Sequence, residues 1–154
     1  MKLLDVNLLI YAHNSATPEH SRARRWFEDI MSRTETVAFP WHTLLGFVRL
    51  TTRATIMQPP LPPGAALDYV EMWLAQPCAA VVHPTNRHPA VLRDLLDAVG
   101  TAGNRTSDAH LAALAIEHGA TLCSRDEDFG RFPGLRWLDP IASGPSLPPQ
   151  RDGR

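Results

Sequence analysis

Two groups of polar and acidic side chains follow apolar segments that are typical of short buried strands. Asp5 and Asn7 come directly after the apolar start of the chain, in LLDVNLLIYA. Ser124, Asp126 and Asp128 follow the apolar run ATLC, in SRDEDF. Because ligands of open α/β sheets bind outside the carboxyl ends of the strands, these positions are candidates for a functional site.

A third acid, Asp108, opens the helical pattern TSDAHLAALA, which leads into the ATLC segment. Carboxylates gathered from three segments repel one another, and a divalent cation is their natural compensation. Mg²⁺ bound by one or two carboxylates, waters and substrate phosphates performs phosphodiester hydrolysis, because it stabilises charge and generates hydroxide. Taken singly, each acid could instead be a helix cap, a first-turn acid or a turn residue. Their joint placement favours the cation site.

Short apolar segments bounded by polar, Gly or Pro residues predict the strands that would position these acids. The first precedes Asp5 and the fourth precedes Ser124. We expect strands at residues 2–4, 36–39, 79–83, 120–123 and 136–138.

Helical periodicity alternates with these strands. The segment after Thr17-Pro18 carries an apolar stripe, and we expect Thr17 to cap it and Pro18 to be its first helical residue. Gly119 is the expected C-cap of the helix at residues 107–118. Strands alternating with helices indicate an α/β domain with a mainly parallel sheet. The helical segments are 6–12, 17–33, 41–53, 65–76, 89–99 and 107–118.

The length of 154 residues suggests one domain, which we place at residues 1–140, followed by a flexible tail at 141–154 that contains three prolines and two glycines. Cys78 and Cys123 lie in apolar contexts, as buried thiols of a reduced compartment do. No segment reaches the roughly 20 apolar residues of a membrane span. We therefore expect a cytoplasmic protein without membrane contact.

Charge and basic-residue usage exclude several classes of protein. The formal net charge of −1 argues against nucleic-acid binding by bulk positive charge. Lys2 is the only lysine, which excludes a P-loop, a Schiff base and a kinase-type site. It also disfavours haloacid dehalogenases and receiver domains, and the former would need a second Asp where Asn7 stands. No G-x-G-x-x-G segment supports a dinucleotide site.

The sequence resembles the PIN-domain ribonucleases, in particular the VapC-type toxins of bacterial toxin–antitoxin pairs. The resemblance covers nearly all of residues 1–140. It rests on LLDVNLLIYA, on LLGFVRLTT and on GNRTSDAHLAALAIEHGATLCSRDEDFGRFPGLRWLDP. It implies a three-layer α/β/α sandwich and a Mg²⁺- or Mn²⁺-dependent endoribonuclease that cleaves structured RNA such as tRNA or rRNA, leaving 5′-phosphate and 3′-hydroxyl ends.

The resemblance also implies roles for individual residues and partners. The metal-binding, catalytic acids would be Asp5, Asp108 and Asp126, with Asp128 as a further candidate for the metal shell. Asn7 and Ser124 stand where the family has polar residues that orient the acids. Growth inhibition, a homodimer and a VapB-type antitoxin that blocks the site are implied as well.

One position departs from the family pattern. The helix after the second strand usually carries a glutamate, and here Gly46 takes that place. No Asp or Glu lies between residues 36 and 67. The site then has one carboxylate fewer, so one Mg²⁺ with several waters is easier to hold than two ions. The alternative is a catalytically weak or inactive PIN-like module that binds RNA or an antitoxin.

Basic and amide side chains near these acids are candidates for RNA contact. Arg49 and Arg53 are four residues apart, so a helix would place them on one face, either as a solvated face or as phosphate ligands. Asn104 and Arg105 precede Asp108 and are similar candidates. Catalysis by histidine is disfavoured, because no His shows the pairing with a nucleophile that it needs.

Overall fold

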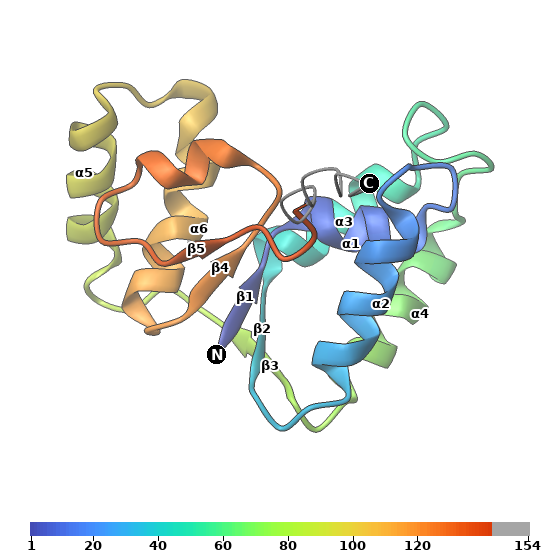
Figure 1. The fold of residues 1–154 in the computed structure, drawn as a ribbon. Helices are drawn as coiled ribbons and strands as arrows, with labels where there is room; N and C mark the ends of the chain where they lie inside the picture. The colour runs from blue at the N-terminus through green and yellow to red at the C-terminus, as the bar shows by residue number, and fades with distance from the viewer. Residues whose placement is uncertain (143–154) are drawn as a thin grey trace, which may run out of the picture.

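A five-stranded parallel sheet forms the centre of the protein in a computed structural model, which describes residues 1–142 (Figure 1). Its order is β3-β2-β1-β4-β5, with every neighbouring pair parallel. The predicted α/β class and the predicted strands are confirmed. The strands are β1 (Lys2–Leu4), β2 (Val37–Pro40), β3 (Ala79–Val82), β4 (Thr121–Cys123) and β5 (Trp137–Leu138).

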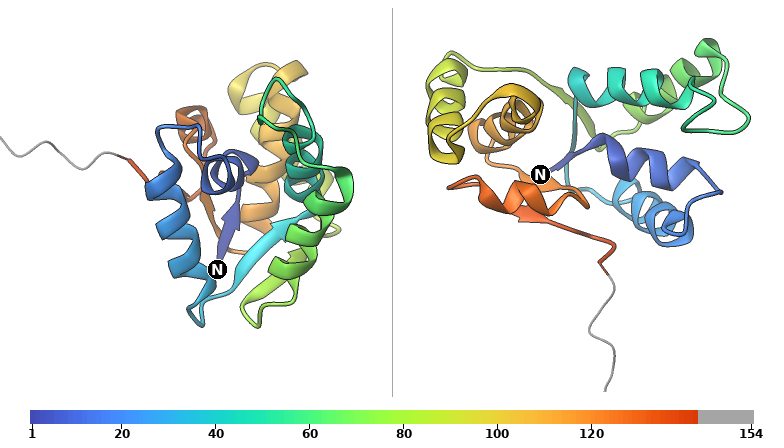
Figure 2. Two further views of the ribbon diagram at one scale, coloured as in Figure 1. Left: turned by 90° about the vertical axis from the view of Figure 1, so that its right-hand side faces the viewer. Right: turned by 90° about the horizontal axis from the view of Figure 1, so that it is seen from above.

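Helices cover both faces of this sheet, as the views of Figures 1 and 2 show. α1 to α4 lie on one side, and α5 and α6 lie on the other, which confirms the three-layer α/β/α sandwich. The helices are α1 (Val6–His13), α2 (His20–Met31), α3 (Trp41–Thr51), α4 (Pro63–Leu74), α5 (His88–Val99) and α6 (Thr106–Glu117), with short 3₁₀ segments η1 (Gly103–Arg105) and η2 (Glu127–Arg131).

The strands divide the hydrophobic core between the two faces. Successive strand side chains point to opposite faces, so Leu4 and Phe39 pack with α1 to α4 while Leu3 and Leu122 pack with α5, α6 and η2. All four are 0% exposed. A strand that is apolar on both faces is what a covered parallel sheet requires.

The strand order changes direction at β1. The chain runs outward from β1 through β2 to β3, and then crosses to the other side of β1 to form β4 and β5. The carboxyl ends of β1 and β4 therefore flank a topological switch point, where α/β sheets leave a crevice for ligands. Asp5 and Ser124 directly follow these two strands.

Several predicted helix ends differ from the structure by two or three residues, and two of these differences have a clear physical reason. Helix α2 begins at His20 rather than after a Thr17 cap, because the Thr17 hydroxyl donates to the Asn14 carbonyl (2.9 Å) and closes a turn there. Helix α3 ends at Thr51, and the Arg53 amide donates to the Leu50 carbonyl three residues back. Arg53 thus lies beyond the helix and does not share a helical face with Arg49.

Other local predictions are confirmed. Gly119 follows α6 with a φ of 62°, in the left-handed region that glycine adopts without strain. Cys78 and Cys123 are free and buried, and burial raises the pKa of the Cys123 thiol to about 12. Within residues 1–142, no helix is long and apolar enough to cross a bilayer.

The end of the described chain is packed against the domain. Ile141 is buried in the core on the α1–α4 side, and Arg22 donates to its carbonyl (2.8 Å). Of the segment 141–154 that we expected to be a tail, residues 143–154 lie outside the described part.

Candidate active site

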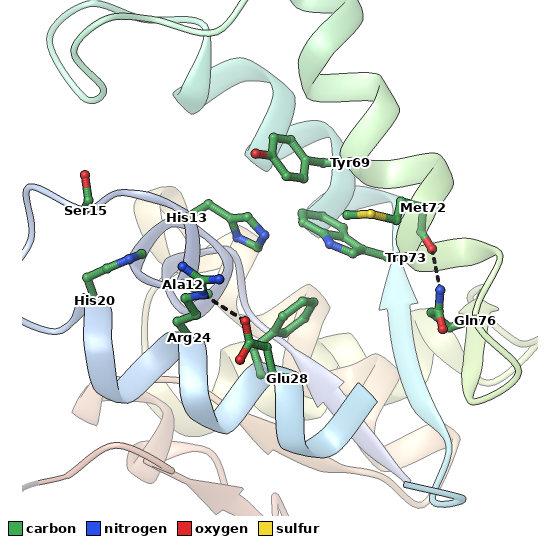
Figure 3. Close-up of a pocket in the computed structure, with 11 residues that line it drawn as sticks. Ala12, His13, Ser15, His20, Arg24, Glu28, Tyr69, Met72, Trp73 and Gln76 are labelled. Atoms are coloured by element: carbon green, nitrogen blue, oxygen red, sulfur yellow. Dashed lines mark hydrogen bonds and ion pairs between the residues drawn. The ribbon is translucent and has the colours of Figure 1, made fainter. Parts of the chain in front are cut away.

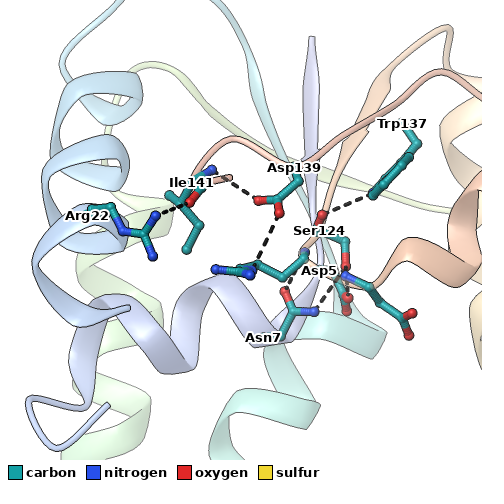
Figure 4. Close-up of polar contacts among 9 residues, drawn as sticks. Asp5, Asn7, Arg22, Ser124, Trp137, Asp139 and Ile141 are labelled. Atoms are coloured by element: carbon teal, nitrogen blue, oxygen red, sulfur yellow. Dashed lines mark hydrogen bonds and ion pairs between the residues drawn. The ribbon is translucent and has the colours of Figure 1, made fainter. Parts of the chain in front are cut away.

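Asp5 and Ser124 meet at the carboxyl ends of β1 and β4 (Figure 4). The Asp5 amide donates to the Cys123 carbonyl, which continues the pairing of the two strands. The Asp5 carboxylate caps α1 by accepting from the Val6 amide (2.7 Å), and it accepts from the Ser124 hydroxyl (2.7 Å). Both side chains are buried, so the hydrogen bonds fix the position of this carboxylate.

The Ser124 hydroxyl is the centre of a polar network. It donates to Asp5 and accepts from the Asn7 side-chain amide (3.0 Å) and from the Asp126 backbone amide (3.0 Å). One donor and two acceptor positions are the full capacity of a hydroxyl. Ser124 therefore links Asp5 to the start of the Asp126 turn, and Asn7 holds the Ser124 hydroxyl.

Asp126 and Asp128 belong to the same turn but have different surroundings. Asp126 caps η2 by accepting from the Asp128 amide (2.9 Å), and its side chain is exposed. Asp128 forms ion pairs with Arg105 (3.2 Å) and Arg131 (3.3 Å). Asp126 is thus an open carboxylate beside Asp5, whereas two arginines neutralise Asp128.

Asp108, in the first turn of α6, completes the cluster electrostatically. Burial raises the pKa of Asp108, and the charges of Asp126 and Asp5 raise it further. Burial also raises the pKa of Asp5, against the hydrogen bonds from Ser124 and Val6, and the charge of Asp126 adds to the increase. The three predicted acids therefore lie close enough to oppose one another's ionisation.

The donor set suits a hard cation. Its atoms are carboxylate oxygens, which are the ligands preferred by Mg²⁺ and Mn²⁺. In residues 1–142, no group of three or more His, Cys, Asp or Glu side chains is arranged to hold an ion directly. Mg²⁺ needs only one or two carboxylates and keeps several waters, so an ion at these carboxylates does not require three direct protein ligands.

The structure places the four residues predicted to contact RNA in different surroundings. Arg105 lies at the site, because it pairs with Asp128 and its charge lowers the pKa of Asp108. Arg49 is exposed on α3 and its charge lowers the pKa of His42 on the same helix. Arg53 lies beyond α3, and Asn104 is exposed in η1.

Gly46 lies where α3 passes the beginning of α1. A Cβ at this position would lie 3.3 Å from Val6 Cγ2, so the glycine permits a close approach of the two helices. Val6 follows Asp5, which places Gly46 beside the cluster. In the part of the chain that the structure describes, α3 contributes no carboxylate to this wall of the site.

Several residues that hold the site were not found by sequence reasoning. The Thr43 hydroxyl donates to the Leu4 carbonyl (2.8 Å), which ties α3 to the end of β1. The Trp137 indole donates to the Ser124 carbonyl (3.0 Å), and the Ser124 amide donates to Leu138. Their only signal is their place next to predicted strand ends. Contacts among three histidines, His42 of α3, His88 of α5 and His110 of α6, were also not predicted.

An apolar pocket of about 510 Å³ lies elsewhere, between α2 and α4 (Figure 3). Phe27, Tyr69, Trp73 and His13 form its aromatic lining, and Arg24 and Glu28 pair at its edge (2.8 Å). None of the three acids lines this pocket, so it is separate from the acidic cluster.

A parallel α/β sheet with carboxylates at its switch point has its candidate site where open α/β sheets bind their ligands. The sequence model of the PIN domain matches residues 2–135, and the chain belongs to this family. It is 47% identical over 142 residues to ribonuclease VapC37 of Mycobacterium tuberculosis. The matched segment covers 92% of this chain and 99% of VapC37.

Two solved structures share the fold at lower identity. One is the sarcin–ricin loop cleaving toxin VapC20 of M. tuberculosis, with a TM-score of 0.64, 19% identity, and coverage of 88% of this chain and 99% of VapC20. The other is VapBC2 of Rickettsia felis bound to a DNA fragment from its promoter, with a TM-score of 0.64, 18% identity, and coverage of 89% and 96%.

Proposed function

We propose that this protein is a divalent-cation-dependent endoribonuclease and the toxin of a toxin–antitoxin pair. The observation that carries the proposal is the convergence of Asp5, Asp108 and Asp126 at the switch point of the sheet, where burial and mutual repulsion raise the pKa values of Asp5 and Asp108. The 47% identity to ribonuclease VapC37 supports RNA as the substrate.

The residues present would hold Mg²⁺ or Mn²⁺ through Asp5, Asp108 and Asp126. Such an ion, when bound, supplies charge stabilisation at the phosphate and an activated water. Asp5 is held by two hydrogen bonds and provides a fixed anionic point. Asp108 has no hydrogen bond or ion pair among residues 1–142 and is free to turn toward a ligand.

The chain also contributes groups that bind and orient RNA. Arg105, which pairs with Asp128, and the exposed Arg49 of α3 would contact backbone phosphates, where an Arg fork binds two oxygens. Ser124 and Asn7 maintain the geometry of Asp5 and of the Asp126 turn. Since few basic residues are involved, RNA recognition would depend on its shape and on unstacked bases.

We propose structured RNA as the substrate and a VapB-type antitoxin as the partner. VapC20, which shares the fold, is a sarcin–ricin loop cleaving toxin, and the fold neighbour from R. felis is a VapBC assembly. An antitoxin arginine placed against Asp108 and Asp126 would neutralise and block the site. A homodimer in the cytoplasm and growth inhibition by the free protein complete the proposal.

A second candidate function follows from Gly46. The wall that α3 provides carries no carboxylate, so the protein could bind RNA or its antitoxin without efficient turnover. This module would bind RNA equally well with and without a divalent cation.

A cleavage assay on protein freed of its antitoxin tests the proposal. We expect tRNA or rRNA to be cut with Mg²⁺ or Mn²⁺, not to be cut with chelator, and to be cut at least roughly 100-fold more slowly by Asp108→Asn. Asp94→Asn on the exposed face of α5 is the matched control, because it removes the same charge away from the site. Chelator-insensitive cleavage, or full activity of Asp108→Asn, would contradict the proposal.

A further inference from the structure

Four side chains form a continuous chain from the interior to the edge of the acidic cluster. The Glu117 side chain at the end of α6 is 0% exposed and lies 2.5 Å from His88 Nδ1. His88 Nε2 lies 2.9 Å from His110 Nδ1. The His110 ring packs edge-on against the His42 ring of α3, with 5.6 Å between the centroids.

The Glu117 end of this chain is held by several hydrogen bonds. Glu117 also accepts from the Thr85 amide (3.0 Å) and the Thr85 hydroxyl (2.5 Å). Burial opposes ionisation of Glu117, but the hydrogen bonds from Thr85 and His88 outweigh it and lower its pKa. The carboxylate therefore accepts from His88, which fixes the orientation of the His88 ring.

The fixed His88 ring then determines the orientation of His110. A neutral His88 accepts at Nε2 and requires a donor at His110 Nδ1, while a protonated His88 donates there. In each state only one tautomer of His110 completes the bond. A histidine held this way presents a defined ring surface to its other neighbour, His42.

His42 lies beside the proposed active site. It is the second residue of α3, and the next residue, Thr43, is bonded to the Leu4 carbonyl directly before Asp5. Its partner His110 is two residues after Asp108 on α6. Burial and the charge of Arg49 lower the pKa of His42, while the charge of Asp108 opposes them, so His42 lies within the fields of both.

We propose that His42 is an RNA-binding residue that stacks against a nucleobase next to the acidic cluster, and that Glu117, His88 and His110 position it. This inference rests on the proposed function. His42 is exposed, whereas His110 and His88 are half-buried, and an exposed aromatic ring beside the acidic cluster suits base stacking. Arg49, on the same helix, would contact the neighbouring phosphate.

A purely structural role would not require His110 and His42. The contact of Thr85 and His88 with Glu117 already ties the β3–α5 loop and α5 to the end of α6. His110 and His42 extend the chain to an exposed position at the site instead. The structural alternative therefore predicts loss of stability, and the proposal predicts loss of RNA affinity.

Fluorescence anisotropy with a labelled single-stranded RNA of mixed sequence, in chelator, tests the RNA contact without cleavage. We expect His42→Ala to weaken binding roughly tenfold, the magnitude of one base stack, and His42→Phe to retain affinity within about threefold. His42→Gln should behave as His42→Ala, and His118→Ala is the control, because His118 contacts the His83 carbonyl outside the chain. Unchanged affinity of His42→Ala, rescue by His42→Gln, or absence of RNA binding by the wild type would overturn the proposal.

A double-mutant cycle tests positioning. Glu117→Gln should weaken RNA binding in the wild type but not in the His42→Ala background. Equal weakening in both backgrounds would show a merely structural role; His88→Gln replaces Glu117→Gln if the latter does not fold.

In the Mg²⁺ cleavage assay, His42→Ala should raise KM with little change in kcat. Because the binding assay needs no turnover, failure of the nuclease function and failure of the His42 contact give different results.

Discussion

The Ser124 hydroxyl is the single group on which the geometry of the proposed site depends most. It is fully buried and satisfies Asp5, Asn7 and the Asp126 amide at once. Its removal would leave three polar groups without this hydrogen-bond partner, and the Asp5 carboxylate among them is buried. Unpaired buried polar groups cost about 1–3 kcal/mol.

We therefore expect Ser124→Ala to lower the free energy of unfolding by about 1–3 kcal/mol, as measured by urea denaturation. RNA cleavage should fall as well, because Asp5 loses the hydrogen bond that holds it and lowers its pKa. Ser107→Ala, at an exposed serine of α6, is the control. Unchanged stability of Ser124→Ala would refute the proposed network.

The raised pKa of Asp108 predicts a pH-dependent stability effect in the absence of divalent cations. Above the folded-state pKa, the folded protein carries an ionised Asp108 that burial, Asp126 and Asp5 disfavour. Asp108→Asn should then be more stable than the wild type at pH 7, by less than about 1 kcal/mol after solvent screening. The advantage should shrink as the pH falls through the raised pKa, and disappear below the ordinary value of 3.8, where Asp108 is protonated in both states.

Urea denaturation of both proteins between pH 7 and pH 4 measures this difference. Asp94→Asn should show no comparable trend. A stability difference between Asp108→Asn and wild type that does not change with pH would mean that the acids do not interact as the structure indicates.

At the scale of elements, α3 carries the position where the sequence resemblance implies a glutamate and this chain has Gly46. A glutamate at position 46 would add a carboxylate, but its Cβ would meet Val6 Cγ2 at 3.3 Å. Gly46→Glu and Gly46→Ala share this steric cost, so the difference between them reports the carboxylate alone.

We expect Gly46→Glu to bind Mn²⁺ roughly tenfold more tightly than Gly46→Ala in calorimetric titration, because each added carboxylate strengthens a hard-cation site. Both variants should lose similar stability. If they bind Mn²⁺ equally, residue 46 does not face the cation site, and the interpretation of Gly46 as the missing acid is wrong.

The elements could be predicted where the local pattern agrees with the tertiary structure. Helix α6 and strand β4 follow from a run of small apolar residues and from the glycine at 119, which packing and turn geometry both require. The predicted start of α2 at Thr17 is wrong because the Thr17 hydroxyl donates to the Asn14 carbonyl and does not cap a helix. The predicted end of α3 at Arg53 is wrong because no glycine or proline marks the end of this helix.

The positions of the candidate site residues could be predicted from the sequence only in part. The strand-end rule located Asp5, Ser124 and Asp126, because parallel strands place their carboxyl ends at one edge. The contacts of Trp137 with Ser124 and of His88 with Glu117 join residues 13 and 29 positions apart. No local pattern contains that information.

At the scale of the whole molecule, the order of the strands creates the site. The crossover from β3 to β4 brings the C-terminal acids next to Asp5, which is more than 100 residues away in the sequence. A net charge of −1 is compatible with this arrangement, because acids gather at the switch point while Arg105 pairs with Asp128 beside them. The central claim is that this cluster uses a cation to direct water at an RNA phosphate.

Mapping the ends of the cleaved RNA tests that claim most directly. Cleavage with Mg²⁺ in ¹⁸O-labelled water should give a 3′-hydroxyl end and a 5′-phosphate that contains the label, because water is the nucleophile. Asp108→Asn should form almost none of this product. A 2′,3′-cyclic phosphate with a 5′-hydroxyl end would show attack by the RNA's own 2′-hydroxyl, and would contradict the account.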